Sequence, residues 1–180
     1  AYAWRPAQVG MQSGCRVHTA EGDAWIRPTS GPIDTLSAVW SGQSASTPQL
    51  VNAVHKTRSR MSTVYEQTIS ALADAAHSGI EAWRTGDRAT LMACAQASND
   101  ALSKLGHAAG QDLVTNVHRT LNQIAGARGV IKPTGAGGGD LAWLIGRSAE
   151  AEAEVRAELS ALGHRCYTFR ICPSDDAERS

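Results

Sequence analysis

The sequence predicts an α+β fold, a two-layer sandwich in which helices pack on one face of an antiparallel sheet. Two observations support this fold class. The middle of the chain is dominated by apolar residues at helical spacing, and strand-like segments precede and follow it. In addition, the strand-like segments 129–132 and 141–145 are joined by a glycine-rich loop without a helix, a connection typical of antiparallel neighbours.

Composition is that of a folded globular protein. The chain has 180 residues, of which 42% are hydrophobic and 19% charged, enough to bury a core. Lys plus Arg and Asp plus Glu number 17 each, and this zero net charge argues against nucleic acid or an anionic membrane as partner. No apolar run has the length of a membrane helix. The four cysteines form no CxxC pair, so we expect reduced thiols, no metal site and a cytoplasmic location.

The first 35 residues contain a weak strand–turn–strand pattern. Apolar residues between Cys15 and Pro28 flank the polar sequence Glu21-Gly22-Asp23, which predicts a hairpin that turns there. The chain begins without a methionine, in a segment that resembles the middle of a strand. We therefore expect residues 1–35 to link the following domain to a preceding half of a longer protein.

A short apolar run over 36–40 predicts a buried strand just before the first helix. Two helix starts fit the residues that follow. Ser46 and Gln49 match a capping box, and Thr47 would alternatively be the N-cap residue with Pro48 at the first helical position. Both interpretations begin a helix near residue 47.

Apolar residues at helical spacing then predict either one long helix up to Ala76 or two helices that meet near Ser62. Gly79 and Gly86 bracket a weakly patterned piece. Asp87 is placed to cap the next helix, which we expect to end at Gly106.

The last third of the chain predicts a helix over 110–125, the two strands around the glycine loop, and a helix that begins at Ser148 and ends at Gly163. Clean alternation over 165–171 predicts a final strand. The domain therefore extends over 36–172, and the polar residues 173–180 predict a frayed tail.

Four glycines within residues 135–139 are the most informative local feature. Such a run costs backbone entropy, so positive φ angles or the close approach of another backbone or a ligand must require it. Exposed amides in such a loop can form an anion-binding nest, although a tight hairpin connection fits the residues equally well. A P-loop and a dinucleotide fingerprint are both excluded, because no Gly-Lys pair precedes Ser or Thr and because a strand follows Asp140.

The segment 132–140, KPTGAGGGD, is similar to the third signature of the GHMP kinases, the family of galactokinase, homoserine kinase, mevalonate kinase and phosphomevalonate kinase. The form that ends in Asp140 rather than Cys most resembles the phosphomevalonate kinase branch. Upstream, residues 40–47, WSGQSAST, resemble the strand-to-helix turn of that branch. A looser match covers 86–106 and includes Asn99. Order and spacing agree from Leu36 to Ile171.

The resemblance implies the C-terminal half of an ATP-dependent small-molecule kinase, with a ferredoxin-like domain. It implies ATP and Mg²⁺ as cofactors, bound mainly by the other half, and mevalonate 5-phosphate as acceptor, with mevalonate, homoserine or a sugar as alternatives. The family's PxxxGLGSSAA loop and its proposed catalytic Asp have no counterpart here, so no catalytic residue is assigned. The expected partners are the N-terminal half, in cis or as a separate chain, a phosphorylated small molecule and, if the fold dimerises, a second copy.

The resemblance also implies phosphate or substrate contacts, each of which competes with an ordinary structural role. Helix capping is the alternative for the hydroxyls near residue 47, and a solvated strand end for the lysine. Asn99 fits a polar helix position and Asp140 a structural hydrogen bond. A non-catalytic ligand-binding or dimerisation domain is the competing function, which the intact signature disfavours. The candidate residues are Ser44, Ser46, Thr47, Lys132, Thr134, Gly135, Ala136, Gly137 and Gly138.

Overall fold

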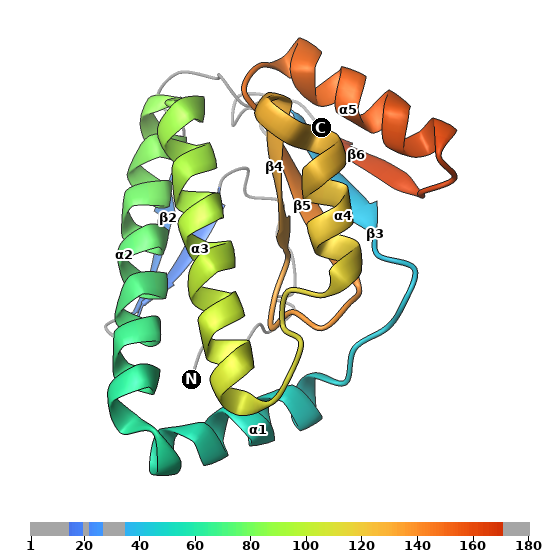
Figure 1. The fold of residues 1–180 in the computed structure, drawn as a ribbon. Coiled ribbons are helices and arrows are strands. Elements are labelled where there is room, and N and C mark those ends of the chain that lie inside the picture. Colours follow the sequence, from blue (N-terminus) through green and yellow to red (C-terminus); the bar gives the residue numbers. More distant parts are fainter. Residues whose placement is uncertain (1–14, 20–21, 27–34, 171–180) are drawn as a thin grey trace, which may run out of the picture.

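The computed structural model describes residues 15–19, 22–26 and 35–170, arranged as shown in Figure 1. Predictions that fall on residues 1–14, 27–34 and 171–180, among them the linking segment and the frayed tail, lie outside the described residues. None of the described helices is both long enough and apolar enough to cross a membrane.

The core of the fold is a four-stranded antiparallel sheet with the strand order β4–β5–β3–β6. β3 lies inside the sheet and pairs with β5 through Trp40 and Leu141, and with β6 through Val39 and Cys166. β4 pairs with β5 and forms one edge. The predicted α+β class and antiparallel pairing are therefore confirmed. The strands are β3 Thr35–Trp40, β4 Gly129–Pro133, β5 Leu141–Gly146 and β6 Cys166–Arg170.

The predicted N-terminal hairpin is present as β1 Cys15–Thr19 and β2 Gly22–Ile26. Its predicted turn is wrong in position. Gly22 and Asp23 are strand residues, paired with Thr19 and His18, whereas Glu21 lies outside the described residues.

The long helical region is divided into α1 Thr47–Arg60 and α2 Ser62–Thr85, which confirms the prediction of two helices that meet near Ser62. The weakly patterned piece between Gly79 and Gly86 is the last part of α2. Gly79 lies inside α2, where a Cβ would make only ordinary contact with Cys94 on α3. Packing along α3 outweighs the low helix propensity of one glycine. α2 ends at Gly86, which is left-handed with φ 76°.

The next helix, α3 Arg88–Ala109, begins as predicted, since Asp87 accepts a 3.0 Å hydrogen bond from the amide of Thr90. Its predicted end at Gly106 is wrong, because the left-handed cap is Gly110 with φ 64°. Gly106 is needed for a different reason. A Cβ there would lie 2.6 Å from the carbonyl oxygen of Gln111, so the loop after the helix folds back against it.

The helix predicted over 110–125 is shorter in the structure, α4 Asn116–Ala125, and residues 110–115 form a loop. α5 Ala149–Ala161 begins after Ser148, whose side chain caps it as predicted. A 3₁₀ helix, Gly126–Arg128, connects α4 to β4.

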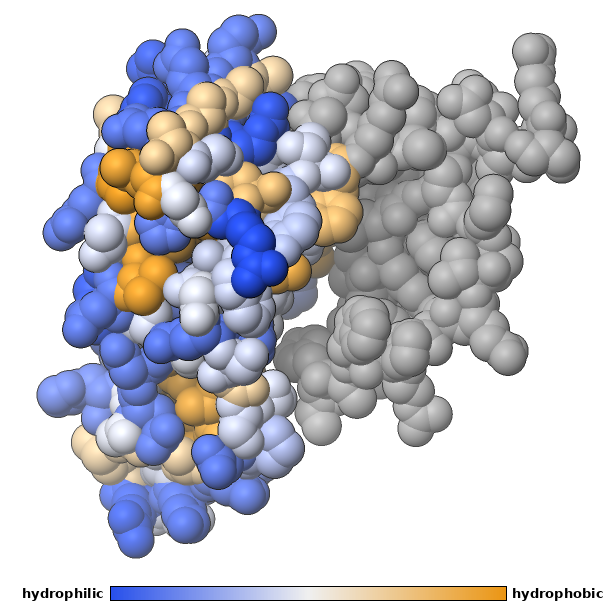
Figure 2. All heavy atoms as spheres, turned by 90° about the vertical axis from the view of Figure 1, so that its right-hand side faces the viewer, coloured by the Kyte–Doolittle hydropathy of each residue, from blue (hydrophilic) through white to orange (hydrophobic). Residues whose placement is uncertain are grey.

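Two helices cover one face of the sheet. α4 and α5 pack there around a buried apolar cluster, and the described surface on their side is mostly hydrophilic with small hydrophobic patches (Figure 2). α2 and α3 lie side by side at the β4 end of the sheet, so that β4 stands between α3 and α4 (Figure 1). The buried cluster consists of Val39, Leu121, Ala125, Ile131, Ala142, Leu144, Val155 and Leu159.

The outer edge of β4 is closed by two asparagine side chains. The Ile131 amide donates a 2.7 Å hydrogen bond to Oδ1 of Asn122 on α4. The Ile131 carbonyl accepts from Nδ2 of Asn122 at 2.5 Å and from Nδ2 of Asn99 on α3 at 2.9 Å. These bonds satisfy backbone groups that an edge strand leaves open. They also give Asn99 a structural function at a buried position, since its exposed fraction is 5%.

Candidate functional site

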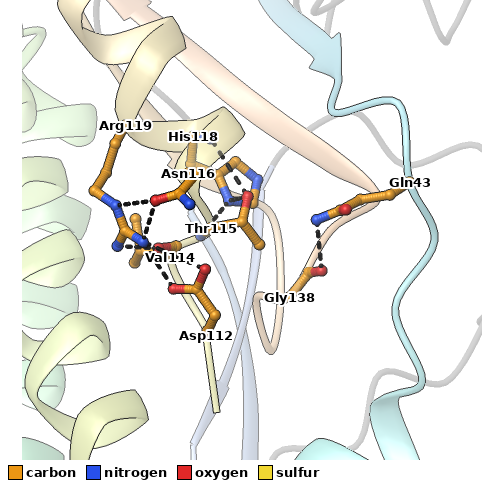
Figure 3. Close-up of polar contacts among 8 residues, drawn as sticks. All are labelled: Gln43, Asp112, Val114, Thr115, Asn116, His118, Arg119 and Gly138. Carbon is orange, nitrogen blue, oxygen red and sulfur yellow. Dashed lines mark hydrogen bonds and ion pairs between the residues drawn. The ribbon is translucent and has the colours of Figure 1, made fainter.

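The glycine loop, residues 134–140, lies between two segments that are distant in the sequence (Figure 3). The Gly138 amide donates to the Leu113 carbonyl at 2.8 Å, which joins the loop to residues 110–115. The Asp140 amide donates to the Gln43 carbonyl at 2.8 Å, and the Gln43 side chain donates to the Gly138 carbonyl at 3.3 Å. The fold thus brings the glycine loop next to residues 40–47, and these are the two parts of the chain for which phosphate contacts were predicted.

Three of the loop glycines are required by the packing of the chain itself. Gly137 has φ 85°, and a Cβ there would lie 2.1 Å from the carbonyl oxygen of Leu113. Gly138 has φ 79° and would place a Cβ 2.8 Å from Cδ1 of Leu50. Gly139 has φ 154° and would bring a Cβ within 2.8 Å of the Gln43 carbonyl oxygen. Positive φ disfavours a side chain at all three positions, and backbone contacts also exclude one at Gly137 and Gly139.

Gly135 is the glycine that packing does not explain. It is exposed, its φ is not positive, and a Cβ built on it would meet no atom within 4 Å. A side chain would fit the described structure, so the open space above this residue is compatible with the approach of a ligand.

The backbone amides of the loop differ in whether they have an acceptor. Thr134 is engaged, because its amide and its hydroxyl both donate to the Leu141 carbonyl, at 3.1 and 3.0 Å. The amides of Gly135, Ala136 and Gly137 have no acceptor in residues 15–19, 22–26 and 35–170. Successive free amides of this kind form an anion-binding concavity. Gly137 is buried, where an amide without an acceptor is unfavourable unless a ligand or water supplies one.

The hydroxyl groups at the start of α1 do not cap the helix. Ser46 occupies the N-cap position, but its side chain forms no capping bond, so the predicted capping box with Gln49 is wrong. The alternative with Thr47 as the cap is also wrong, because Thr47 is the first helical residue. Ser44, Ser46 and Thr47 are exposed, and the backbone of Ser44 passes beside Gly139. Ser44 therefore lies beside the glycine loop, and the hydroxyls of Ser44, Ser46 and Thr47 form no hydrogen bond with the described residues.

Lys132 is the candidate residue on β4, near the strand end that leads into the glycine loop. It is paired with Trp143 on the sheet face that points away from α4 and α5. There it lines a mainly apolar pocket of about 330 Å³ together with Gly135 and side chains of α2 and α3. Its Nζ donates to the Pro133 carbonyl at 3.0 Å, and no carboxylate pairs with it within the described ranges. Burial lowers the pKa of the Lys132 ammonium group.

The loop 110–115, which fastens the glycine loop, is itself held by Arg119 (Figure 3). Arg119 Nη2 lies 3.0 Å from Asp112 Oδ1 and 2.9 Å from Asn116 Oδ1. Arg119 Nη1 also donates to the Val114 carbonyl. Sequence reasoning missed this loop by extending a helix through it.

A second support for that loop is the capping box between Thr115 and His118. The Thr115 side chain accepts from the His118 amide, while the Thr115 amide donates to Nδ1 of His118 at 3.1 Å. A polar residue three positions after a threonine is the sequence signal that could have identified this start of α4.

Asp140 has φ 58°, and it is the one residue other than glycine with positive φ in the described part of the chain. Its carbonyl accepts from the Ser41 amide at 2.9 Å and its amide donates to Gln43, so the structural role predicted for it is carried by its backbone. Within the residues that the structure describes, no three His, Cys, Asp or Glu side chains gather where they could hold a metal ion. Cys94 and Cys166 are free thiols.

No protein-family model matches the chain, and the proteins that it resembles include phosphomevalonate kinases. Phosphomevalonate kinase of Streptomyces sp. (strain CL190) is 29% identical over 140 residues, which are 77% of this chain and 36% of that protein. The crystal structure of the Lin0012 protein from Listeria innocua is 26% identical, with a TM-score of 0.70, over 78% of this chain and 41% of that one.

A third similar protein shares the fold at lower identity. Streptococcus pneumoniae phosphomevalonate kinase, solved in complex with phosphomevalonate and AMPPNP, is 19% identical with a TM-score of 0.65. The match covers 83% of this chain and 43% of that one. The chain thus spans less than half the length of each of these proteins.

Proposed function

We propose, from the premise that this chain resembles the C-terminal half of a GHMP kinase and most closely the phosphomevalonate kinase branch, that it is half of an ATP-dependent small-molecule kinase. The proposed reaction transfers the γ-phosphoryl group of ATP to mevalonate 5-phosphate and yields the diphosphate. The observation that supports the proposal is the hydrogen bonding between the glycine loop and residues 40–47. In these two segments several amides and hydroxyls have no hydrogen-bond partner among the described residues.

Phosphoryl transfer depends mainly on positioning and on stabilising charge, so a half-site made of fixed donors suits it. The free amides of Gly135, Ala136 and Gly137 would donate to phosphate oxygens, as in other backbone nests. The hydroxyls of Ser44, Ser46 and Thr47 would contact a second part of the substrate. The start of α1 adds the positive end of its helix dipole to this side of the site.

Lys132 and Gly135 would act together, because they line the same pocket. Lys132 is partly buried, and an ammonium group in this position without a carboxylate partner is favoured by an anion nearby. We propose that the positive charge of Lys132 attracts a phosphate group that binds near Gly135. Thr134 is proposed to shape the loop rather than to donate its hydroxyl to substrate, since Leu141 already accepts that hydrogen bond.

ATP and Mg²⁺ are proposed to bind mainly to an N-terminal half, in cis or in a separate chain, that carries the phosphate loop and the catalytic Asp of the family. In this arrangement the described domain closes one side of the cleft. The domain boundaries that we propose remain 36–172, with residues 1–35 leading to the other half.

The direct test is a titration of the 180-residue chain, followed by amide chemical shifts in nuclear magnetic resonance spectra. Mevalonate 5-phosphate, ATP with Mg²⁺, and homoserine or mevalonate as unphosphorylated comparisons would be added in turn. We expect phosphorylated ligands to shift the amides of Gly135, Ala136 and Gly137 and to leave Gly163, just after α5, unchanged. Equal shifts at Gly163, or none at the loop for any phosphorylated ligand, would remove the loop from the binding site.

A further inference from the structure

The His118 ring contacts Thr115 (Figure 3), and Thr115 follows closely after Leu113, which binds the glycine loop. Nδ1 of the ring lies 3.1 Å from both the amide nitrogen and the hydroxyl oxygen of Thr115. Two residues before Thr115, the Leu113 carbonyl accepts the 2.8 Å hydrogen bond of the Gly138 amide. The ring therefore supports, together with Arg119, the end of the loop 110–115 to which the glycine loop is bound.

The contacts determine the protonation state of the ring in this arrangement. Because the Thr115 amide is a donor, Nδ1 must be an unprotonated acceptor, and the proton of the neutral ring resides on Nε2. The side chain is fully buried, and Nε2 has no partner among the described residues. A second proton, on Nδ1, would place two hydrogen-bond donors, the ring N–H and the Thr115 N–H, against each other. It would also bury a positive charge.

Two charged groups influence the ring. Burial has the largest effect and lowers the pKa of His118, while Asp112 favours the protonated form and Arg119 disfavours it. The residues that face α4 from β4, β5 and α5 include Ile131, Leu144 and Val155 and others of the same apolar cluster. These side chains are uncharged and cannot neutralise a protonated ring.

The glycine loop has little freedom to absorb a movement of Leu113. A Cβ on Gly137 would lie 2.1 Å from the Leu113 carbonyl oxygen, so the two backbones are in direct contact. A shift of this carbonyl would change the hydrogen bond to Gly138 and the direction of the neighbouring free amides at once.

We propose that His118 is a positioning residue that holds the glycine loop in its open-amide geometry, through Thr115 and Leu113, only while its ring is neutral. Protonation breaks the bond from the Thr115 amide, loosens the loop 110–115 and releases the Gly138 amide. The effect on phosphate binding rests on the proposed function, whereas the effect on Gly138 is a property of the fold that is measured without any ligand.

The test is amide hydrogen exchange of the 180-residue chain from about pH 7.5 to about pH 5, corrected for the intrinsic pH dependence of exchange. In the unmodified chain we expect the protection of Gly138 to fall as the pH falls. The control is the Leu91 amide, which donates to Asp87 at the start of α3 and should keep its protection.

Two variants distinguish a proton-dependent cap from a merely structural residue. In His118→Gln, the new side chain can complete the capping box but cannot take up a proton, so Gly138 should stay protected at every pH. In His118→Leu, the acceptor is lost, and the protection of Gly138 should fall about fivefold at every pH. The proposal is overturned if His118→Gln keeps the pH dependence of the unmodified chain, or if Leu91 loses protection in parallel with Gly138.

Discussion

The amide of Gly138 donates a 2.8 Å hydrogen bond to the carbonyl of Leu113, and this bond fastens the glycine loop to the loop that precedes α4. A motif recognised in the sequence is thereby held by a segment that carries no motif. The relationship separates two kinds of glycine in the loop, those that the fold requires and the one that it leaves open.

Gly137→Ala and Gly135→Ala should affect different properties. Gly137→Ala should lower the free energy of unfolding by about 1–3 kcal/mol, because of its positive φ and the contact with the Leu113 carbonyl. Gly135→Ala should change it by less than about 0.5 kcal/mol, since a Cβ there meets nothing. Urea denaturation measures both variants.

The same pair separates stability from binding. Gly135→Ala should weaken the binding of a phosphorylated ligand although the fold is intact, because the methyl group occupies the space above the free amide. Unchanged affinity in Gly135→Ala would show that the open space is not used by a ligand.

Lys132→Met should stabilise the chain at neutral pH by up to about 1 kcal/mol while it weakens phosphate binding, because it removes a partly buried charge that lacks a carboxylate partner among the described residues. The pKa of Lys132 is below its usual 10.5, so the unfolded chain binds more protons between the folded-state pKa and 10.5. Stability of the unmodified chain should therefore rise with pH across that window.

Thermal denaturation as a function of pH checks this prediction. In Lys132→Met the stability should not show the rise with pH that Lys132 causes. Lys132→Arg is the matched control that keeps the charge. Loss of stability in Lys132→Met at neutral pH would instead indicate that the ammonium group contributes to the fold through Pro133.

His118 should make stability depend on pH in the acidic range. Its pKa is below the usual 6.5, so the unfolded chain binds more protons than the folded chain below about pH 6.5. The free energy of unfolding should fall as the pH is lowered, by up to about 1.4 kcal/mol per pH unit, until the folded-state pKa is reached. The free energy of unfolding is measured against pH for the unmodified chain and for His118→Gln, and the difference between the two gives the contribution of His118. Identical pH profiles would contradict the prediction.

The two asparagines at the β4 edge should contribute unequally. Asn122→Ala leaves the Ile131 amide without an acceptor and should cost about 2–3 kcal/mol of stability. Asn99→Ala should cost about 1 kcal/mol, because Asn122 still donates to the same carbonyl. Denaturant titration compares the two. A loss of ligand affinity in Asn99→Ala without a loss of stability would favour a substrate contact instead.

Phosphoryl transfer from ATP to mevalonate 5-phosphate should be absent in this chain alone and should appear when an N-terminal half is supplied, its own or that of the Streptomyces relative. The physical reason is that the proposed half-site offers donors for phosphate but no assigned base. A coupled assay for ADP measures turnover, and mevalonate, homoserine and galactose test the acceptor. Turnover by the chain alone would refute the divided site.

The sequence was most informative where local chemistry decides the conformation. The Asp87 cap, the antiparallel strands around the glycine loop and the resemblance to phosphomevalonate kinases could be inferred from residue types and spacing. The break between α1 and α2 was one of two alternatives that the spacing allowed. Each depends on neighbours within a few positions or on a motif.

Tertiary structure decided what depends on distant segments. α3 continues past Gly106 because Gln111 approaches its backbone, and α4 begins only where Thr115 and His118 cap each other. The sequence could identify the glycine loop, but only the fold shows that Gly137 and Gly138 serve contacts with Leu113 and Leu50, while Gly135 stays open. The physical reason is that a run of glycines indicates only that side chains are excluded. The atoms that exclude them belong to residues elsewhere in the chain.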